Sequence, residues 1–112
     1  MELMYEYSGD VTVVILTGTQ LDASTAAEFK SSIAPVLAEH SQIVFDLNHL
    51  GFIDSSGLGV FLSCLRHVQA KGGDLKLCGI MKPVRALFEL VRMHKIFQIF
   101  DTQEEAIRAF QL

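Results

Sequence analysis

The sequence predicts an α/β domain in which a mostly parallel sheet carries a β-hairpin at its N-terminal end and βα units after it. Short segments rich in apolar and β-branched residues alternate with longer segments whose apolar residues recur every three or four positions. A turn sequence, Ser8-Gly9-Asp10, separates the first two of the short segments. The chain has 112 residues, 50% of them hydrophobic, which is enough for one core. We therefore expect a single domain over residues 1–112.

The N-terminal third predicts a hairpin followed by a helix. Residues 3–7 alternate in side-chain character, and residues 11–17 form a run rich in β-branched residues. After this hairpin, apolar residues at helical spacing predict a helix that begins near Asp22, with Asp22 or Ser24 as its N-cap. Pro35 is expected to kink or shorten this helix, because proline lacks the backbone N–H of a helical hydrogen bond.

The middle of the chain repeats the alternation of strand and helix. Residues 43–47 form a short apolar strand, and residues 58–68 carry the apolar stripe of a second helix that ends at Gly72-Gly73. Residues 75–80 predict the next strand. Pro83 then suits the first turn of a third helix, where its missing N–H costs nothing.

The C-terminal segment predicts a last strand over residues 96–100 and a last helix. Thr102 and Glu105 have the spacing of a capping box that opens a helix running through Phe110. Strands separated by helices of this length form βαβ units and a parallel sheet. In such sheets, the loops that follow the carboxyl ends of the strands carry the functional site.

Composition and charge exclude several classes of function. The net charge is −4 and the basic residues are scattered, so we expect no nucleic-acid binding. The longest aliphatic run, residues 13–16, is too short to span a membrane, and the start lacks a basic signal region, so we expect a cytoplasmic protein. Cys64 and Cys78 lie apart in apolar segments, as buried reduced thiols do. The four histidines are dispersed, so we expect no metal and no cofactor.

The segment from Asn48 to Gly59 is the most informative, because it follows a strand and opens a helix. Asp54 or Ser55 can act as the N-cap of that helix, and an acidic side chain there also complements the helix dipole. Capping does not account for Gly57 and Gly59, because glycine destabilises a helix by up to about 1 kcal/mol relative to alanine. The two glycines therefore suggest that something approaches this backbone closely.

This segment resembles a known family. Residues 52–59, preceded by residues 44–47, resemble the D-S-S/A-G-L-G signature of STAS-domain anti-sigma factor antagonists. Further stretches with the same resemblance are Leu16-Thr17-Gly18, Leu21-Asp22, Lys71-Gly72-Gly73, Val84 to Phe88 and His94 to Phe97. The resemblance covers nearly the whole chain and implies a STAS fold.

The resemblance also implies a function, which is partner switching in the regulation of bacterial transcription. The unphosphorylated antagonist binds an anti-sigma factor that is a serine kinase of the GHKL type, and phosphorylation releases it. The acceptor in the family motif corresponds to Ser55, and a serine phosphatase of the PPM family removes the phosphate. The chain would then be a substrate and a ligand, not an enzyme. The sequence favours a monomer without deciding the oligomeric state.

The expected partner-binding surface combines the motif with the loop after the second strand. Asp54 is expected to act both as a cap and as a determinant that the kinase reads, while Ser24 and Ser56 also have purely structural interpretations. The loop departs from the family pattern at Thr19-Gln20, where one acidic residue is usual, so the identity of the partner stays open. The predicted surface consists of Asp22, Ser24, Asp54, Ser55, Ser56, Gly57, Leu58 and Gly59.

Three alternatives remain. The first is a STAS module that acts as a scaffold in a signalling assembly or binds a nucleotide or lipid. The second is a receiver domain phosphorylated on Asp54, which Lys82-Pro83 would suit, although the chain lacks the acidic pair that holds Mg²⁺ after a receiver's first strand. The third is a serine hydrolase using Ser55, which lacks the G-x-S-x-G elbow.

Overall fold

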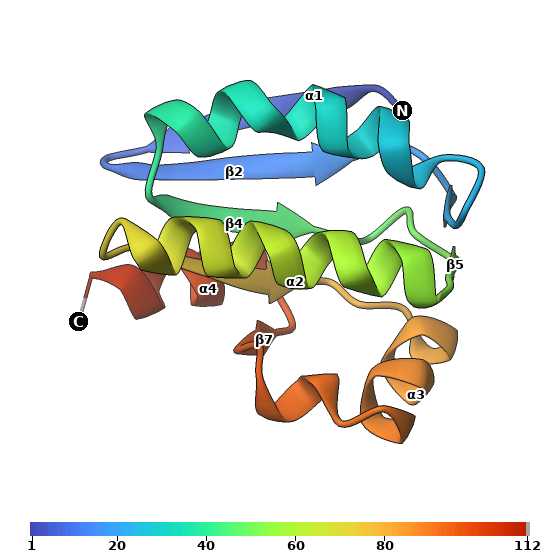
Figure 1. Cartoon of the computed structure of the whole chain (residues 1–112). Coiled ribbons are helices and arrows are strands. Elements are labelled where there is room, and N and C mark those ends of the chain that lie inside the picture. Colours follow the sequence, from blue (N-terminus) through green and yellow to red (C-terminus); the bar gives the residue numbers. More distant parts are fainter. Residues whose placement is uncertain (112) are drawn as a thin grey trace.

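The computed structural model, which describes residues 1–111, contains a five-stranded sheet and a separate two-stranded sheet (Figure 1). In the large sheet the order is β1-β2-β4-β6-β7; β1 pairs antiparallel with β2, and all other pairs are parallel. The strands are β1 (Leu3–Ser8), β2 (Val11–Leu16), β3 (Gln20–Leu21), β4 (Gln42–Asp46), β5 (Phe52–Ile53), β6 (Asp74–Cys78) and β7 (Ile99–Phe100). The predicted α/β fold with an N-terminal hairpin is confirmed.

The helices lie on both faces of the large sheet. They are α1 (Ala26–Glu39), α2 (Ser55–Ala70), α3 (Lys82–Leu90), the short 3-10 helix η1 (Met93–Lys95) and α4 (Gln103–Phe110). In Figure 1, α1 and α2 run side by side in front of the sheet, and α4 lies behind it. Among residues 1–111, no helix has both the length and the apolar character needed to cross a membrane.

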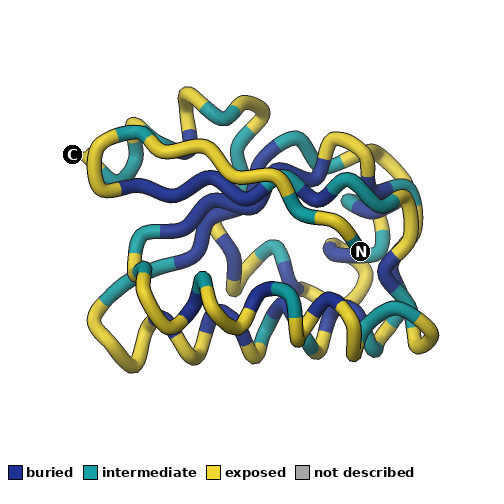
Figure 2. Tube along the Cα trace, turned by 90° about the horizontal axis from the view of Figure 1, so that it is seen from above, coloured by how far each residue is buried: buried dark blue, intermediate teal, exposed yellow. Residues whose placement is uncertain are grey.

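The larger core lies between the sheet and helices α1, α2 and α3. Its centre is a chain of aromatic contacts in which Phe45 lies 5.8 Å from Phe29 and 5.4 Å from Phe61, measured between ring centroids. Phe88 of α3 extends this chain to Phe61 at 6.5 Å. Figure 2 shows the consequence, because the inner strands are buried along their length while β1 is exposed at the sheet edge. Edge-to-face and tilted aromatic packing of this kind stabilises a core beyond its buried area.

The opposite face of the sheet holds a smaller core under α4 and the buried charged side chain of Lys76. Ala106 of α4 packs with Val13 and Val44 in this core. Lys76 is 5% exposed; its ammonium group contacts the carboxylate of Asp74 at 3.1 Å and lies 4.5 Å from the centre of the Phe110 ring. Buried charges need partners of this kind, because removal from water disfavours them.

The helix α1 differs from the prediction at both ends. It begins at Ala26 with Thr25 in the N-cap position, so neither Asp22 nor Ser24 caps it directly. The chain needs these residues for a tight turn before the helix, in which the Ser24 backbone N–H donates to Asp22 Oδ1. Pro35 does not shorten the helix, which continues to Glu39.

The C-terminal third combines confirmed and corrected elements. The strand predicted over residues 96–100 is limited to β7, because the chain first forms η1 and then turns, with Phe97 N–H bonded to the Met93 carbonyl. The Thr102 cap is confirmed, since its hydroxyl accepts the Glu105 N–H at 3.2 Å. The prediction of buried thiols is also confirmed: burial raises the pKa of Cys64 and of Cys78 to about 12, so both are protonated.

Candidate functional site

The predicted site lies at the carboxyl end of the sheet, where the loop after β3 meets the junction of β5 and α2 (Figure 1, right). The two-stranded sheet makes this meeting possible, because Leu21 of β3 pairs in parallel with Ile53 of β5. The Asp54 N–H continues the pairing by donating to the Leu21 carbonyl at 3.2 Å. Asp22 is therefore brought beside Asp54, as the parallel-sheet argument predicts.

Asp54 is the residue that ties the site together. Its Oδ1 accepts the backbone N–H groups of Ser56 at 2.9 Å and of Gly57 at 3.2 Å, which makes it the N-cap of α2. Its Oδ2 accepts the backbone N–H of Ala23 at 3.1 Å from the loop after β3. One carboxylate thus fixes the start of the helix and the neighbouring loop, and the predicted capping role of Asp54 is confirmed.

Ser55 is the first residue of α2 and is exposed to solvent. Ser56 is half-buried, and its backbone N–H is already bonded to Asp54. Within residues 1–111, the Ser55 side chain makes no hydrogen bond to a histidine or to any other group that could act as a base. The Ser55 hydroxyl is therefore open to solvent, and within residues 1–111 it lacks the bonded base with which a hydrolase activates its nucleophile.

The two glycines of the motif have different explanations. A Cβ at Gly57 would lie 2.6 Å from the Leu21 carbonyl oxygen and 2.7 Å from Ile53 Cγ1, so packing within this chain requires glycine there. This corrects the expectation that both glycines indicate the approach of something external. A Cβ at Gly59 would meet nothing within 4 Å, and this residue is exposed. Leu58 is 7% exposed and belongs to the core.

Asp22 and Ser24 bond to each other at the rim of the site. Asp22 Oδ1 accepts the Ser24 hydroxyl at 2.6 Å and the Ser24 backbone N–H at 2.9 Å, and the Thr25 hydroxyl accepts the Asp22 N–H at 3.0 Å. The hydrogen bond from the Ser24 hydroxyl, with smaller contributions from the Ser24 N–H and from Thr25, lowers the pKa of the Asp22 carboxyl below 3.8, although desolvation opposes this shift. Asp22 is therefore negative at neutral pH and lies one residue away from the contact between Ala23 and Asp54.

The two segments that form the site carry negative charge. Neither residues 18–28 nor residues 48–65 include a lysine or arginine, whereas both segments contain aspartate. The motif search also missed Phe52, an exposed aromatic side chain on β5 that is 52% accessible. Phe52 lies in the stretch that resembles the family signature, but an apolar residue carries no sequence signal of its own exposure.

This fold, with a serine at the start of the helix that follows β5, is that of a STAS domain. The STAS domain family model matches residues 2–106, and the chain therefore belongs to that family. The anti-sigma F factor antagonist of Paenibacillus polymyxa is 31% identical over 116 aligned residues, which cover 100% of this chain and 97% of the relative. The resemblance to anti-sigma factor antagonists expected from the motif is thereby confirmed.

Solved structures agree with this assignment. The anti-sigma factor antagonist SpoIIAA in its unphosphorylated form superposes with a TM-score of 0.80 at 25% identity, covering 98% of this chain and 96% of that one. An anti-sigma factor antagonist from Mycobacterium paratuberculosis, 24% identical, shares the fold with a TM-score of 0.87 over 99% of this chain and 94% of the other.

Proposed function

We propose that this chain is an anti-sigma factor antagonist that is switched by phosphorylation of Ser55. Unphosphorylated, it binds a cytoplasmic anti-sigma factor that is a GHKL-type serine kinase; phosphorylation by that kinase releases it, and a PPM-family phosphatase restores it. The chain acts as ligand and substrate in this cycle, and the catalytic groups belong to its partners. The membership of the family and the named function of its relatives support the proposal.

The observation that carries the proposal is that Asp54 already accepts the backbone N–H groups at the N-terminus of α2. The backbone N–H groups of a helix N-terminus can hold a phosphate. Here the N–H groups of Ser56 and Gly57 are bonded to Asp54 Oδ1, and the Leu58 N–H is bonded to the Asp54 carbonyl. A phosphate on Ser55 would therefore find these three donors already occupied.

The negative surroundings add to this effect. A phosphoserine carries roughly −1.5 to −2 charges at neutral pH, and Asp22 and Asp54 already line the site without a lysine or arginine in either segment. Burial of this uncompensated charge against a partner costs on the order of 3 to 5 kcal/mol. Such a cost corresponds to a loss of affinity of roughly a hundredfold to several thousandfold, with no change in the fold.

The receiver alternative is less well supported by the geometry. Both carboxylate oxygens of Asp54 accept backbone N–H groups, so a phosphate on Asp54 would first have to break the cap of α2. Ser55 is exposed and its modification breaks no such bond. The scaffold alternative differs only in the consequence of the modification, and the test below separates it.

The test compares Ser55→Ala and Ser55→Asp proteins as baits in a lysate of the source bacterium, with Ser56→Ala as the matched control. We expect Ser55→Ala and Ser56→Ala to retain a GHKL-type serine kinase and Ser55→Asp to bind it at least tenfold more weakly. The captured kinase and ATP should then phosphorylate the wild-type chain on Ser55, as mass spectrometry would show. Equal capture by the alanine and aspartate baits would contradict the switch and favour a scaffold, and an acyl phosphate labile to hydroxylamine would favour the receiver.

A further inference from the structure

The strand β1 forms an open edge of the five-stranded sheet. Within residues 1–111 it pairs with β2 alone, so one side of its backbone meets no other strand. Figure 2 shows this edge as an exposed run beside the buried inner strands. The strand contributes no residue to the proposed partner surface around Ser55, so its role is independent of the function proposed above.

The hairpin determines which backbone groups of β1 face outward. A two-residue turn follows Ser8, and at the other end of the hairpin the Thr17 N–H donates to the Glu2 carbonyl. Because bonded pairs alternate along an antiparallel ladder, the even-numbered residues of β1 bond to β2. The residues whose N–H and carbonyl groups point away from the sheet are therefore Leu3, Tyr5 and Tyr7.

This edge lacks the features that keep edge strands from pairing with another chain. Residues 3–8 contain no lysine and no proline, and the register with β2 continues without a bulge along the whole strand. The side chains of Met4, Tyr5 and Tyr7 are exposed. An uninterrupted edge with apolar side chains is a template on which a further strand can pair.

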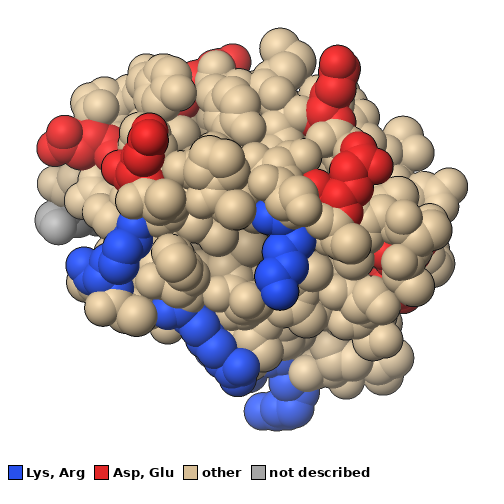
Figure 3. All heavy atoms as spheres, turned by 45° about the horizontal axis from the view of Figure 1, so that its top comes forward, with Lys and Arg blue, Asp and Glu red and all other residues tan. Residues whose placement is uncertain are grey.

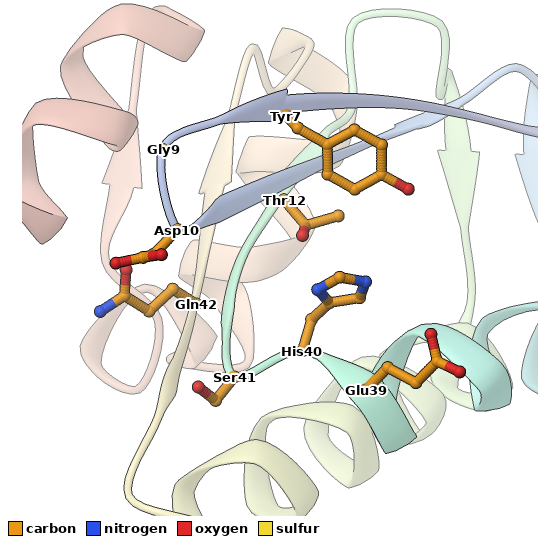
Figure 4. Close-up of a pocket in the computed structure, with 8 residues that line it drawn as sticks. All are labelled: Tyr7, Gly9, Asp10, Thr12, Glu39, His40, Ser41 and Gln42. Carbon is orange, nitrogen blue, oxygen red and sulfur yellow. The ribbon is translucent and has the colours of Figure 1, made fainter.

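The aromatic side chains of the edge lie on the side of the sheet that α1 covers. Figure 4 shows the Tyr7 ring above His40 at the end of α1, and the two ring centroids lie 5.9 Å apart. Tyr5 and Tyr7 also line a small cleft of about 180 Å³ against α1. Because side chains alternate along a strand, Met4 and Glu6 lie on the opposite face. An added strand would therefore meet aromatic rings on one face and a carboxylate beside a methionine on the other.

Carboxylates restrict how a second copy of this chain could pair with the edge. Glu2, Glu6 and Asp10 lie within the first ten residues, and the first lysine or arginine of the chain is Lys30. On the face shown in Figure 3, most acidic side chains likewise lie apart from the basic ones and above them. Since like charges directly opposite each other destabilise a pair of strands, a second copy fits only in a register that separates the carboxylates.

One antiparallel register of two β1 strands satisfies the outward backbone groups of both. When Tyr5 lies opposite the partner's Tyr5, Leu3 lies opposite the partner's Tyr7, and each such pair exchanges N–H and carbonyl bonds. The two Tyr5 rings then lie side by side on the face that α1 covers, where aromatic cross-strand pairs stabilise a sheet.

The same register keeps the carboxylates from lying directly opposite each other. Glu6 lies opposite the partner's Met4, whereas a shift by two residues in either direction places it opposite the partner's Glu6 or the partner's Glu2. The two Glu6 side chains remain diagonal neighbours, about 7 to 8 Å apart. Salt screens exposed charges at this distance, so a higher salt concentration should favour the pairing.

We propose that two copies of this chain form an antiparallel dimer through β1, centred on Tyr5, which joins their two sheets into one. Backbone hydrogen bonds supply the attraction, and the carboxylates select the register. A single pair of edge strands buries less area than a standard interface, so the dimer is weak and dissociates on dilution.

The test is sedimentation equilibrium of the full-length chain from about 10 µM to about 1 mM, which spans the dissociation constants of weak complexes. We expect a monomer–dimer equilibrium that moves towards the dimer as the salt concentration rises. In the dimer, amide hydrogen exchange should slow at Leu3, Tyr5 and Tyr7 but not at Met4 and Glu6, which already bond to β2. A chain that stays monomeric at the highest concentration would overturn the proposal and leave the edge to a different protein. A dimer that protects none of the three outward amides would overturn it as well.

Two variants one residue apart test the register. Tyr5→Lys places two lysines opposite each other in the dimer and should raise the dissociation constant roughly tenfold. Met4→Lys places a lysine opposite the partner's Glu6 and should lower the dissociation constant about threefold. Both side chains are exposed, so neither substitution opens the core, and the melting temperature of each variant checks this. Weakening of the dimer by both lysines alike would overturn the proposal.

Discussion

The carboxylates at the two ends of the parallel sheet differ in whether groups of the same chain bond to them. At the carboxyl end, Asp54 accepts three backbone N–H groups and Asp22 accepts both the N–H and the hydroxyl of Ser24. At the amino end, Asp10 and Glu39 line an open cleft, and no ion pair joins them to the rest of residues 1–111. Side chains satisfied internally build a fixed surface on which one hydroxyl can act as a switch. The two carboxylates at the amino end stay exposed to solvent.

The two ends are similar in how their chain segments approach each other. Each contains a glycine against which a backbone carbonyl of another segment packs: Gly57 meets Leu21 at the carboxyl end, and Gly73 meets Ser41 at the amino end. The position of each end therefore depends on a contact that allows no side chain. Substitutions at these glycines test how strongly each end depends on its contact.

The largest effect is expected for Gly73→Ala. The new Cβ would overlap the Ser41 carbonyl oxygen, which also accepts the Asp74 N–H at 2.9 Å. Because a backbone atom cannot move aside as a flexible side chain can, the free energy of unfolding should fall by about 3 kcal/mol. Urea unfolding would measure it. Gly51→Ala is the control, since its Cβ would lie 3.8 Å from the nearest neighbour, the Thr19 carbonyl oxygen, and a fall as large as that for Gly73→Ala would contradict the explanation.

Gly57→Ala should lower the free energy of unfolding by about 2 kcal/mol, because its Cβ would press on the Leu21 carbonyl and on the Ile53 side chain, part of which can shift. Gly59→Ala is the matched control on the same helix. It should raise the free energy of unfolding by roughly 0.5 to 1 kcal/mol, because alanine favours the helix and the added methyl meets nothing.

Gly57→Ala and Gly59→Ala also test which of the two glycines takes part in binding a partner at the carboxyl end of the sheet. If Gly59 serves the approach of a partner, Gly59→Ala should weaken capture of the anti-sigma factor while stabilising the fold. A variant that is more stable and binds unchanged would remove Gly59 from the proposed surface. Loss of binding by Gly57→Ala would be uninformative without its melting temperature, since that residue supports the fold itself.

Asp54→Ala should lower the free energy of unfolding by about 1 to 2 kcal/mol, the typical cost of a lost helix cap. It also removes the acceptor of the Ala23 N–H, so hydrogen exchange should accelerate at Ala23 as well as at Ser56 and Gly57. Asp10→Ala at the other end is the comparison and should change the free energy of unfolding by less than about 0.5 kcal/mol. Equal losses for the two variants would mean that the contrast between the ends is wrong.

The elements with a strong periodic pattern or a clear turn could be predicted from the sequence. The hairpin, the strand β4, the helix α2 and the cap at Thr102 all form where local chemistry places them. The strand over residues 96–100 was predicted too long, because apolar residues that alternate also suit the 3-10 turn that packs Met93 and Phe97 into the core. Periodicity does not distinguish these two ways of burying the same side chains.

The residues of the candidate site could be proposed from the sequence, whereas the contacts that connect them could not. The pairing of β3 with β5 involves two residues on each strand, which is too short for any sequence pattern to reveal. It determines that Asp54 reaches Ala23 and that Gly57 packs against Leu21, and both contacts join segments about thirty residues apart. The role of Gly57 was misjudged for this reason, since only the tertiary contact shows what a side chain there would strike.

The smallest expected effect concerns the titration of Asp22. Its lowered pKa comes first from the hydrogen bond donated by the Ser24 hydroxyl, so Ser24→Ala should bring this pKa back towards 3.8, as NMR of the carboxyl carbon would show. Because the folded pKa lies below the unfolded one, the contribution of Asp22 to stability is present above the unfolded value and is lost as the pH falls through the folded one. The turn at residues 22–25 should therefore loosen only below about pH 4, the ordinary range of an aspartate. An unchanged pKa in Ser24→Ala would show that backbone N–H groups, rather than this hydroxyl, hold the carboxylate at the rim of the candidate site.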